Sequence, residues 1–254
     1  MLAIDAGNTN IVLGLFREGE LVHHWRIHTD RQKLVDEYAD LIASLLNKVD
    51  IKPIDIKKVA ISNVVPSFQN KLTVLSRRSF GVEPFFVSYK NKLNFNIKID
   101  NPKELGADII AAAVAGVEKY GIPSIIIDFG TATTITAIDR DGDFLGGSIA
   151  PGLAISCEAL YDNAPHLPRI NLVNPPSMIG KNTVTAMQSG IYLGYGHLVR
   201  GIVGEMKQII GDDAKVIAAG GLAGVFDKGH KIVDVVDQDI VLEGIYILYK
   251  MNRD

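Results

Sequence analysis

Apolar side chains alternate with polar ones in some segments of the chain and recur every three or four residues in others. Runs rich in β-branched residues predict strands over residues 2–6, 10–16, 21–27, 59–62 and 84–87. Apolar positions spaced by three or four residues predict helices over 34–48 and from Pro66 to about Ser79. The resulting order β-β-β-α-β-α-β favours a mixed sheet with helices on its faces.

The second half of the chain repeats this plan. Strands are expected at 125–128 and 133–138, a helix at 153–161, and a strand from Lys215 that ends in the pair Gly220-Gly221. Shifting the sequence by 128 − 5 = 123 residues lays Asp5 on Asp128 and Gly7 on Gly130. This repeat predicts two similar α/β domains, residues 1–117 and 118–254, with an Asp-x-Gly turn in each half facing a shared cleft.

Each Asp-x-Gly turn contains the groups that bind phosphate. Backbone N–H groups, small residues and hydroxyls bind phosphate chains, and a carboxylate can hold a metal ion or its water. Such groups occur in the segment from Asp5 to Asn10 and again from Asp128 to Thr131. Phosphoryl transfer mainly requires positioning and charge stabilisation, which a paired cradle provides. Two turns in register, with Gly220-Gly221 ending a later strand, indicate duplicated actin-like (ribonuclease H-like) domains that bind a nucleotide.

Asp108 lies near the start of a predicted helix that has almost no polar side. Asn101 and Pro102 suit the beginning of that helix, and Asp108 shares a face with alanines that would pack in the core. A carboxylate in such a place is costly unless it is paired, solvated in a cleft or used chemically. A capping or salt-bridging role is one interpretation. A general base is the other, and it is favoured because Gly106 and Ala107 permit close approach of a substrate.

Further glycines occur where the backbone would approach a neighbour. Those at 146, 147 and 152 precede the helix at 153–161, and Asn182 or Thr183 is expected to cap a helix containing glycines at 190, 194, 196, 201 and 204. A helical glycine costs roughly 1 kcal/mol relative to alanine, so close helix packing is the expected compensation. A dimer interface is one place for such packing.

Composition and charge exclude several classes of protein. The formal net charge of −3 and the dispersed basic residues argue against a nucleic-acid partner. The single cysteine, Cys157, excludes an internal disulfide and fits a reducing compartment. No apolar stretch reaches membrane-spanning length, and the N-terminal residues do not resemble a secretory signal. A soluble cytoplasmic protein without a membrane partner is expected.

Four motifs together resemble type III pantothenate kinases. They begin at Asp5 (D-x-G-N-T-N), Asn101 (N-P-x-E-x-G-A-D), Asp128 (D-x-G-T-A-x-T) and Gly147 (G-x-I-x-P-G), and the likeness runs over the whole chain in order. The resemblance implies an actin-like homodimer that transfers the γ-phosphate of ATP to the terminal hydroxyl of pantothenate, the first step of coenzyme A synthesis. It also implies a need for Mg²⁺ and for a monovalent cation, K⁺ or NH₄⁺.

The resemblance also implies roles for individual residues. Asp108 would accept the proton of the pantothenate hydroxyl, Asp128 would hold the monovalent cation, and Asp5 would help to organise Mg²⁺. The residues expected to contact ATP are Asp5, Ala6, Gly7, Asn8, Thr9, Asn10, Ile11, Val12 and Thr131. Those expected to line the pantothenate site are Gly106, Ala107, Asp108, Ile109 and Thr183.

One position departs from the family pattern. The helix motif of the family often reads G-A-D-R, but this chain has Ile109 at the fourth position. An arginine there could pair with the substrate carboxylate, and isoleucine cannot. Either another group does this, or affinity for pantothenate is weakened, or the acceptor is another small hydroxy compound. A catalytically silent relative that binds a nucleotide and serves as a regulatory or accessory protein is the alternative from a different class. The presence of Asp5, Asp108 and Asp128 argues against it.

Overall fold

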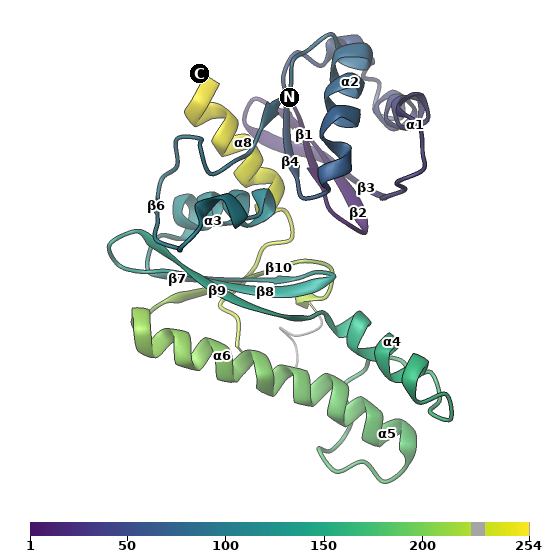
Figure 1. The fold of residues 1–254 in the computed structure, drawn as a ribbon, viewed down its shortest axis with the longest axis vertical. Helices are drawn as coiled ribbons and strands as arrows, with labels where there is room; N and C mark the ends of the chain where they lie inside the picture. Colours follow the sequence, from purple (N-terminus) through teal and green to yellow (C-terminus); the bar gives the residue numbers. More distant parts are fainter. Residues whose placement is uncertain (225–231, 254) are drawn as a thin grey trace. The chain divides into compact units, whose positions relative to one another are not determined.

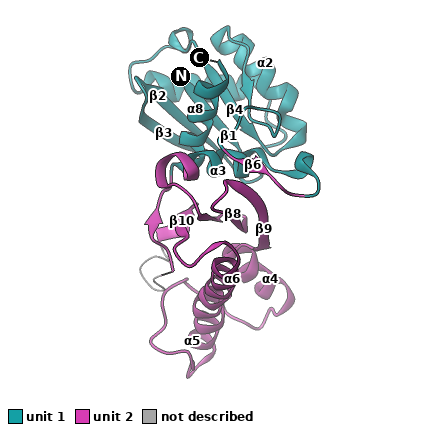
Figure 2. Cartoon of the chain, turned by 90° about the vertical axis from the view of Figure 1, so that its left-hand side faces the viewer, with its two compact units in different colours: residues 1–94, 100–115, 239–254 teal, residues 95–99, 116–238 magenta. Residues whose placement is uncertain are grey.

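The computed structural model describes residues 1–224 and 232–253. The described chain forms two compact units, coloured separately in Figure 2. Unit 1 contains residues 1–94, 100–115 and 239–254, and unit 2 contains residues 95–99 and 116–238. The chain crosses between the units at 94/95, 99/100, 115/116 and 238/239, so neither unit is one continuous stretch of sequence. The C-terminal helix, which the sequence placed with the second domain, packs in unit 1.

Unit 1 is built on a five-stranded mixed sheet of order β3-β2-β1-β4-β5. Figure 1 labels β1 to β4 of this sheet. Its strands are β1 (Leu2–Ala6), β2 (Asn10–Arg17), β3 (Glu20–His28), β4 (Val59–Asn63) and β5 (Phe85–Phe86). Its helices are α1 (Val35–Asn47), α2 (Gln69–Phe80), the first part of α3 (Ala107–Tyr120) and α8 (Ile240–Arg253). Three short 3₁₀ turns complete it: η1 (Pro53–Asp55), η2 (Pro66–Phe68) and η3 (Pro102–Glu104).

The two faces of this sheet carry different helices because side chains alternate along each strand. Leu2, Ile4 and Ala6 of β1 belong to the buried cluster that contains apolar side chains of α1 and α2. Asp5 therefore points to the opposite face. On that face α8 packs closely, since a Cβ at Gly14 would lie 3.0 Å from Leu242 Cδ1.

Unit 2 contains a six-stranded mixed sheet of order β11-β10-β7-β8-β9-β6. Its strands are β6 (Asn96–Ile97), β7 (Ser124–Phe129), β8 (Ala132–Ile138), β9 (Asp143–Pro151), β10 (Lys215–Ala219) and β11 (Val235–Val236). Its helices are α4 (Leu153–Asn163), α5 (Thr183–Gln188), the π-helical turn η4 (Ser189–Leu193) and α6 (Gly194–Ile210). Ile125, Ile127 and Phe129 of β7 belong to a buried cluster with Leu153 of α4 and Val199 of α6, so Asp128 points to the other face.

The predicted duplication is confirmed by the sheet topology. The order β3-β2-β1-β4-β5 in unit 1 corresponds to β9-β8-β7-β10-β11 in unit 2, with β6 added beyond β9. In both units the first strand pairs antiparallel with the second and parallel with the fourth member of the repeat. The fold class expected from the sequence, two mixed sheets with flanking helices, is therefore correct.

One helix begins later than the sequence suggested. Asn101 caps the short 3₁₀ turn η3, where its Oδ1 accepts from the backbone N–H of Lys103. Helix α3 starts only at Ala107. Pro102 does occupy the first position of a helical turn, but the chain leaves that turn in an extended conformation at Leu105. Asp108 consequently lies in the first turn of α3.

Candidate active site

The N-terminal Asp-x-Gly turn is fixed by hydrogen bonds of its backbone. Asp5 lies opposite Val12 in β2 and opposite Ser62 in β4. The N–H of Gly7 donates to Asn10 O at 3.0 Å, and the hydroxyl of Thr29 donates to Gly7 O at 2.7 Å. The turn thus presents short polar side chains from a rigid backbone, which suits the binding of phosphate groups.

The two turn residues after Gly7 are exposed. Asn8 Oδ1 accepts a hydrogen bond from Arg31 Nη2 at 3.1 Å, so a guanidinium stands beside this turn. The N–H of Thr29 donates to Thr9 O at 2.9 Å, which ties the end of β3 to the turn. A cationic side chain next to exposed amides adds to the attraction for an anionic ligand.

Asp108 occupies a half-buried position next to Gly106. Its Oδ1 accepts the backbone N–H of Ile109 at 2.8 Å, and a Cβ at Gly106 would lie 2.5 Å from that same oxygen. Burial raises the pKa of Asp108 above its ordinary value, and the hydrogen bond from Ile109 partly offsets this. In the part of the chain that the structure describes, no basic side chain pairs with this carboxylate. The salt-bridge interpretation is therefore not supported. The capping interpretation stays open, because Asp108 accepts a backbone N–H within the first turn of α3. A role as proton acceptor is also chemically suitable.

A cavity of about 650 Å³ lies within unit 1, and its lining ends at the residue before Asp108. Gly106 and Ala107, which directly precede Asp108, line one of its walls. Residues from the end of β4, from η2 and α2, from the segment after β5 and from η3 complete the lining: Asn63, Val64, Pro66, Gln69, Val87, Ser88, Tyr89, Lys103, Glu104 and Leu105. The volume falls in the range of small-ligand sites.

Val64 connects the cavity to the N-terminal turn. Its N–H donates to Ala6 O at 3.1 Å, and its Cγ1 would contact a Cβ at Gly106 at 3.7 Å. The Asp5–Val12 segment and the Gly106–Ile109 segment are therefore neighbours of the same residue. Sequence reasoning did not identify Val64 or the other cavity residues outside 106–107. The signal that could have found them is the polar end of β4, Ser62-Asn63, followed by a proline.

In unit 2 the second Asp-x-Gly turn forms a compact backbone cradle. A Cβ at Gly220 would lie 2.4 Å from Asp128 Oδ1, and one at Gly130 would lie 3.4 Å from Asp128 Oδ2. Gly220 has a φ of +87°, which a side chain rarely adopts. The N–H of Gly152 donates to Thr131 O at 3.0 Å. The structure thus brings Asp128, Gly130 and Thr131 together with Gly152 and Gly220.

The glycines of this cradle have protein neighbours. A Cβ at Gly152 would lie 2.3 Å from Thr131 O, and one at Gly147 would lie 2.2 Å from Ile135 O. Of the three positions where close approach was expected, 147 and 152 are confirmed. A Cβ at Gly146 would meet only Ile99 Cγ2, at 3.4 Å, and this glycine has a φ of +111°. The approaching groups are the chain's own strands and turns.

Thr183, which was expected to contact pantothenate, lies on helix α5. It is the exposed first residue of α5, which Asn182 caps through a hydrogen bond from Thr185 N to Asn182 Oδ1 at 2.9 Å. The predicted cap at Asn182 is correct. A substrate-binding role for Thr183 stays a prediction.

The distribution of acidic residues limits how a metal could be held. Among residues 1–224 and 232–253, no three His, Cys, Asp or Glu side chains are grouped closely enough to cage a metal ion. Mg²⁺ commonly binds through one or two carboxylates together with waters and substrate phosphates. Asp5, at the end of a strand beside the phosphate-type turn, fits that mode of binding.

In the same described residues, no helix combines the length and apolar character that crossing a membrane requires.

The sheet order of both units, with an Asp-x-Gly turn after the first strand of each, defines an actin-like α/β fold. The chain aligns with a solved structure described as a Baf family transcriptional activator from Campylobacter jejuni over 98% of each chain, at 20% identity and a TM-score of 0.65. The ethanolamine utilization protein EutJ from Carboxydothermus hydrogenoformans aligns over 97% of this chain and 89% of its own, at 18% identity and a TM-score of 0.56. An inorganic polyphosphate/ATP-glucomannokinase from Arthrobacter sp. strain KM aligns over 97% and 96%, at 15% identity and a TM-score of 0.50. At these identities the likeness is one of fold.

A family model narrows the assignment. The model of type III pantothenate kinase matches residues 1–205, which include both Asp-x-Gly turns and the Asp108 segment. The chain belongs to the type III pantothenate kinase family.

Proposed function

We propose that this protein transfers the γ-phosphoryl group of ATP to the terminal hydroxyl of pantothenate, giving 4'-phosphopantothenate and ADP. The observation that carries the proposal is Asp108, a half-buried carboxylate of raised pKa that directly follows two residues lining a ligand-sized cavity. Membership of the family supports the choice of reaction. As the first step of coenzyme A synthesis, the reaction would take place in the cytoplasm.

Asp108 would act as the general base. Its carboxylate takes the proton of the pantothenate hydroxyl while that oxygen forms a bond to the γ-phosphorus. The bond between the γ-phosphorus and the bridging oxygen breaks, and ADP leaves with the electron pair. The N–H of Ile109 donates to Asp108 Oδ1, so Oδ2 would be the oxygen that receives the proton. Because the base must be deprotonated, activity should fall with decreasing pH through the raised pKa of Asp108.

The two Asp-x-Gly turns would hold ATP and its cations. The backbone and side chains of Asp5 to Val12, together with Thr131, would bind the nucleotide, and Asp5 would help to hold Mg²⁺, which neutralises phosphate charge when bound. Asp128 would bind K⁺ or NH₄⁺ in the cradle formed by Gly130 and Gly220. Gly106, Ala107, Ile109 and Thr183 would contact pantothenate.

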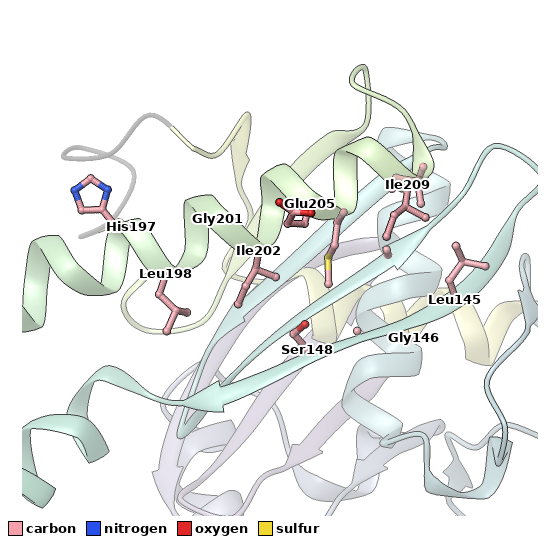
Figure 3. A pocket seen from close by; sticks show the side chains of 13 residues that line it. Leu145, Gly146, Ser148, His197, Leu198, Gly201, Ile202, Glu205 and Ile209 are labelled. Carbon is pink, nitrogen blue, oxygen red and sulfur yellow. The ribbon is translucent and has the colours of Figure 1, made fainter.

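We also propose that the protein is a homodimer. A groove of about 610 Å³ lies between α6 and β9 of unit 2 (Figure 3), and its lining includes Leu145, Leu198 and Ile209. The Ile209 side chain is 75% exposed. A Cβ at Gly201 would contact nothing within 4 Å, so the close packing expected at this helical glycine is not made within the described chain. A second copy of the chain would cover this apolar face.

The proposed reaction is tested by measuring ADP release from Mg-ATP with pantothenate, glucose or N-acetylglucosamine as acceptor. Of the three acceptors, only pantothenate is expected to be phosphorylated. With glucose or N-acetylglucosamine, ADP release should not exceed the background rate. Turnover with a sugar instead would identify a different small-molecule kinase. Binding of ATP without turnover of any acceptor would favour the regulatory alternative, a class suggested by the description of the Campylobacter jejuni structure.

A further inference from the structure

Of the described residues that line the cavity of unit 1, one is basic. That residue is Lys103, the middle residue of η3. Its backbone N–H donates to Asn101 Oδ1, but in the described ranges 1–224 and 232–253 its ammonium group makes no ion pair or hydrogen bond. The cavity lining therefore has one cationic group that the described part of the chain does not engage.

The neighbouring acidic residue is engaged. Glu104 also lines the cavity, and its Oε1 accepts a hydrogen bond from Asn101 Nδ2 at 2.7 Å. The same asparagine thus holds both the backbone of Lys103 and the carboxylate of Glu104. This arrangement restrains the acidic group while it leaves the ammonium group of Lys103 available to an anion.

The backbone between Lys103 and Asp108 is restrained by local hydrogen bonds. Glu104 N donates to Asn101 O at 3.0 Å, and Ile110 N donates to Gly106 O at 3.0 Å. Lys103, Gly106 and Ala107 follow one another along the cavity lining, and Asp108 comes next in the sequence. The cation and the carboxylate are thus held at separate points of one structured segment.

Pantothenate has the matching distribution of groups. It is a linear molecule with the reacting hydroxyl at one end and a carboxylate at the other, so its two ends need different partners. Ile109 cannot pair with the carboxylate because its side chain is aliphatic. Resting on the proposed function, we infer that Lys103 binds the carboxylate of pantothenate while Asp108 receives the proton at the other end. Lys103 is thereby a specificity-determining residue for an anionic acceptor.

The inference is tested by steady-state kinetics of Lys103→Met and Lys103→Arg. Removing a charge-assisted hydrogen bond should raise the KM for pantothenate about 10- to 100-fold, with kcat changed less than about threefold. Lys103→Arg retains the charge and should stay within about threefold of the wild-type KM. Lys48→Met, an exposed lysine at the end of α1, is the matched control and should leave KM unchanged.

A neutral acceptor separates charge recognition from a general loss of activity. In the alcohol analogue of pantothenate a hydroxymethyl group replaces the carboxylate. The wild-type protein should have a higher KM for this analogue than for pantothenate, and Lys103→Met should remove that difference. The KM for ATP should not change in any of these variants.

Three results would overturn the inference. An unchanged KM for pantothenate in Lys103→Met, equal KM values of the wild-type protein for both acceptors, or an increase confined to the KM for ATP would each exclude this role of Lys103. The proposed function would survive all three. Absence of pantothenate turnover by the wild-type protein would instead overturn the proposed function, and the role of Lys103 with it.

Discussion

Gly106→Ala should slow the reaction by displacing the general base while the fold stays intact. The new Cβ would lie 2.5 Å from Asp108 Oδ1, whereas its next neighbours, Asp108 Cγ and Val64 Cγ1, are 3.7 Å away. The close contact is with the end of a flexible side chain, and Gly106 does not have a positive φ. Alanine can therefore be accommodated if the carboxylate moves.

The required movement can be worked from this distance. The oxygen must retreat by about 0.5 to 0.9 Å to reach a tolerated separation of 3.0–3.4 Å. That shift strains the 2.8 Å hydrogen bond from Ile109 N. Since misplacing a reacting group by about 1 Å can cost 10²-fold, kcat should fall about 10- to 100-fold. The free energy of unfolding should change by less than about 1 kcal/mol.

The assay is kcat and KM for pantothenate in the wild-type protein, Gly106→Ala, Asp108→Asn and the double variant. If Gly106 acts through the carboxylate, adding Gly106→Ala to Asp108→Asn should lower kcat less than about threefold further. A full additional loss in the double variant would show that the methyl group blocks the substrate. A kcat for Gly106→Ala equal to that of the wild-type protein would contradict the reasoning altogether.

Three further predictions concern the base, the cation and the assembly. Asp108→Asn should lower kcat about 10²–10⁴-fold and raise the melting temperature at pH 7 but not near pH 3. The pKa of Asp108 is raised in the folded protein, so the folded state binds more protons than the unfolded state. Asp108 therefore lowers the free energy of unfolding as pH rises from about 3.9 through the raised pKa. Equal melting temperatures of Asp108→Asn and the wild-type protein at pH 7 would contradict this. Asp128→Ala should abolish activation by K⁺, and activation that persisted would move the cation site elsewhere. Gly201→Arg should halve the mass found by sedimentation velocity, since it places a long charged side chain on the proposed dimer face; an unchanged dimer would exclude this face.

The fold was largely predictable because the chain is duplicated. The shift that aligns Asp5 with Asp128 also aligns β1, β2 and β3 with β7, β8 and β9. The later strands β4 and β5 correspond to β10 and β11 by their order in the sheet, but not at this shift. Two β-β-β-α-β patterns can bury their apolar residues in the same way. The strands predicted in one half of the chain can therefore be compared with those predicted in the other half. The start of α3 was not predictable to the residue. Asn101 and Pro102 are good signals for a helical start, but they begin a 3₁₀ turn that ends before Gly106.

The candidate site was predictable only where its residues are adjacent in sequence. The Asp-x-Gly turns and the Gly106–Asp108 segment could be identified because each lies in one short motif. The cavity could not, because Val64, Lys103 and Tyr89 come from separate segments and only folding brings them to one lining. The residue types alone do not indicate a shared cavity, since lysine and tyrosine side chains occur on the surface of any protein.

The most direct test of the central claim follows the phosphoryl group itself. Wild-type protein and Asp108→Asn are incubated with ATP labelled with ³²P at the γ-phosphate, Mg²⁺, K⁺ and pantothenate, and the label in 4'-phosphopantothenate is measured over time. The account predicts that the wild-type protein labels 4'-phosphopantothenate rapidly. The rate of labelling by Asp108→Asn should be at least about 100-fold lower. Absence of labelled 4'-phosphopantothenate with the wild-type protein would contradict the account.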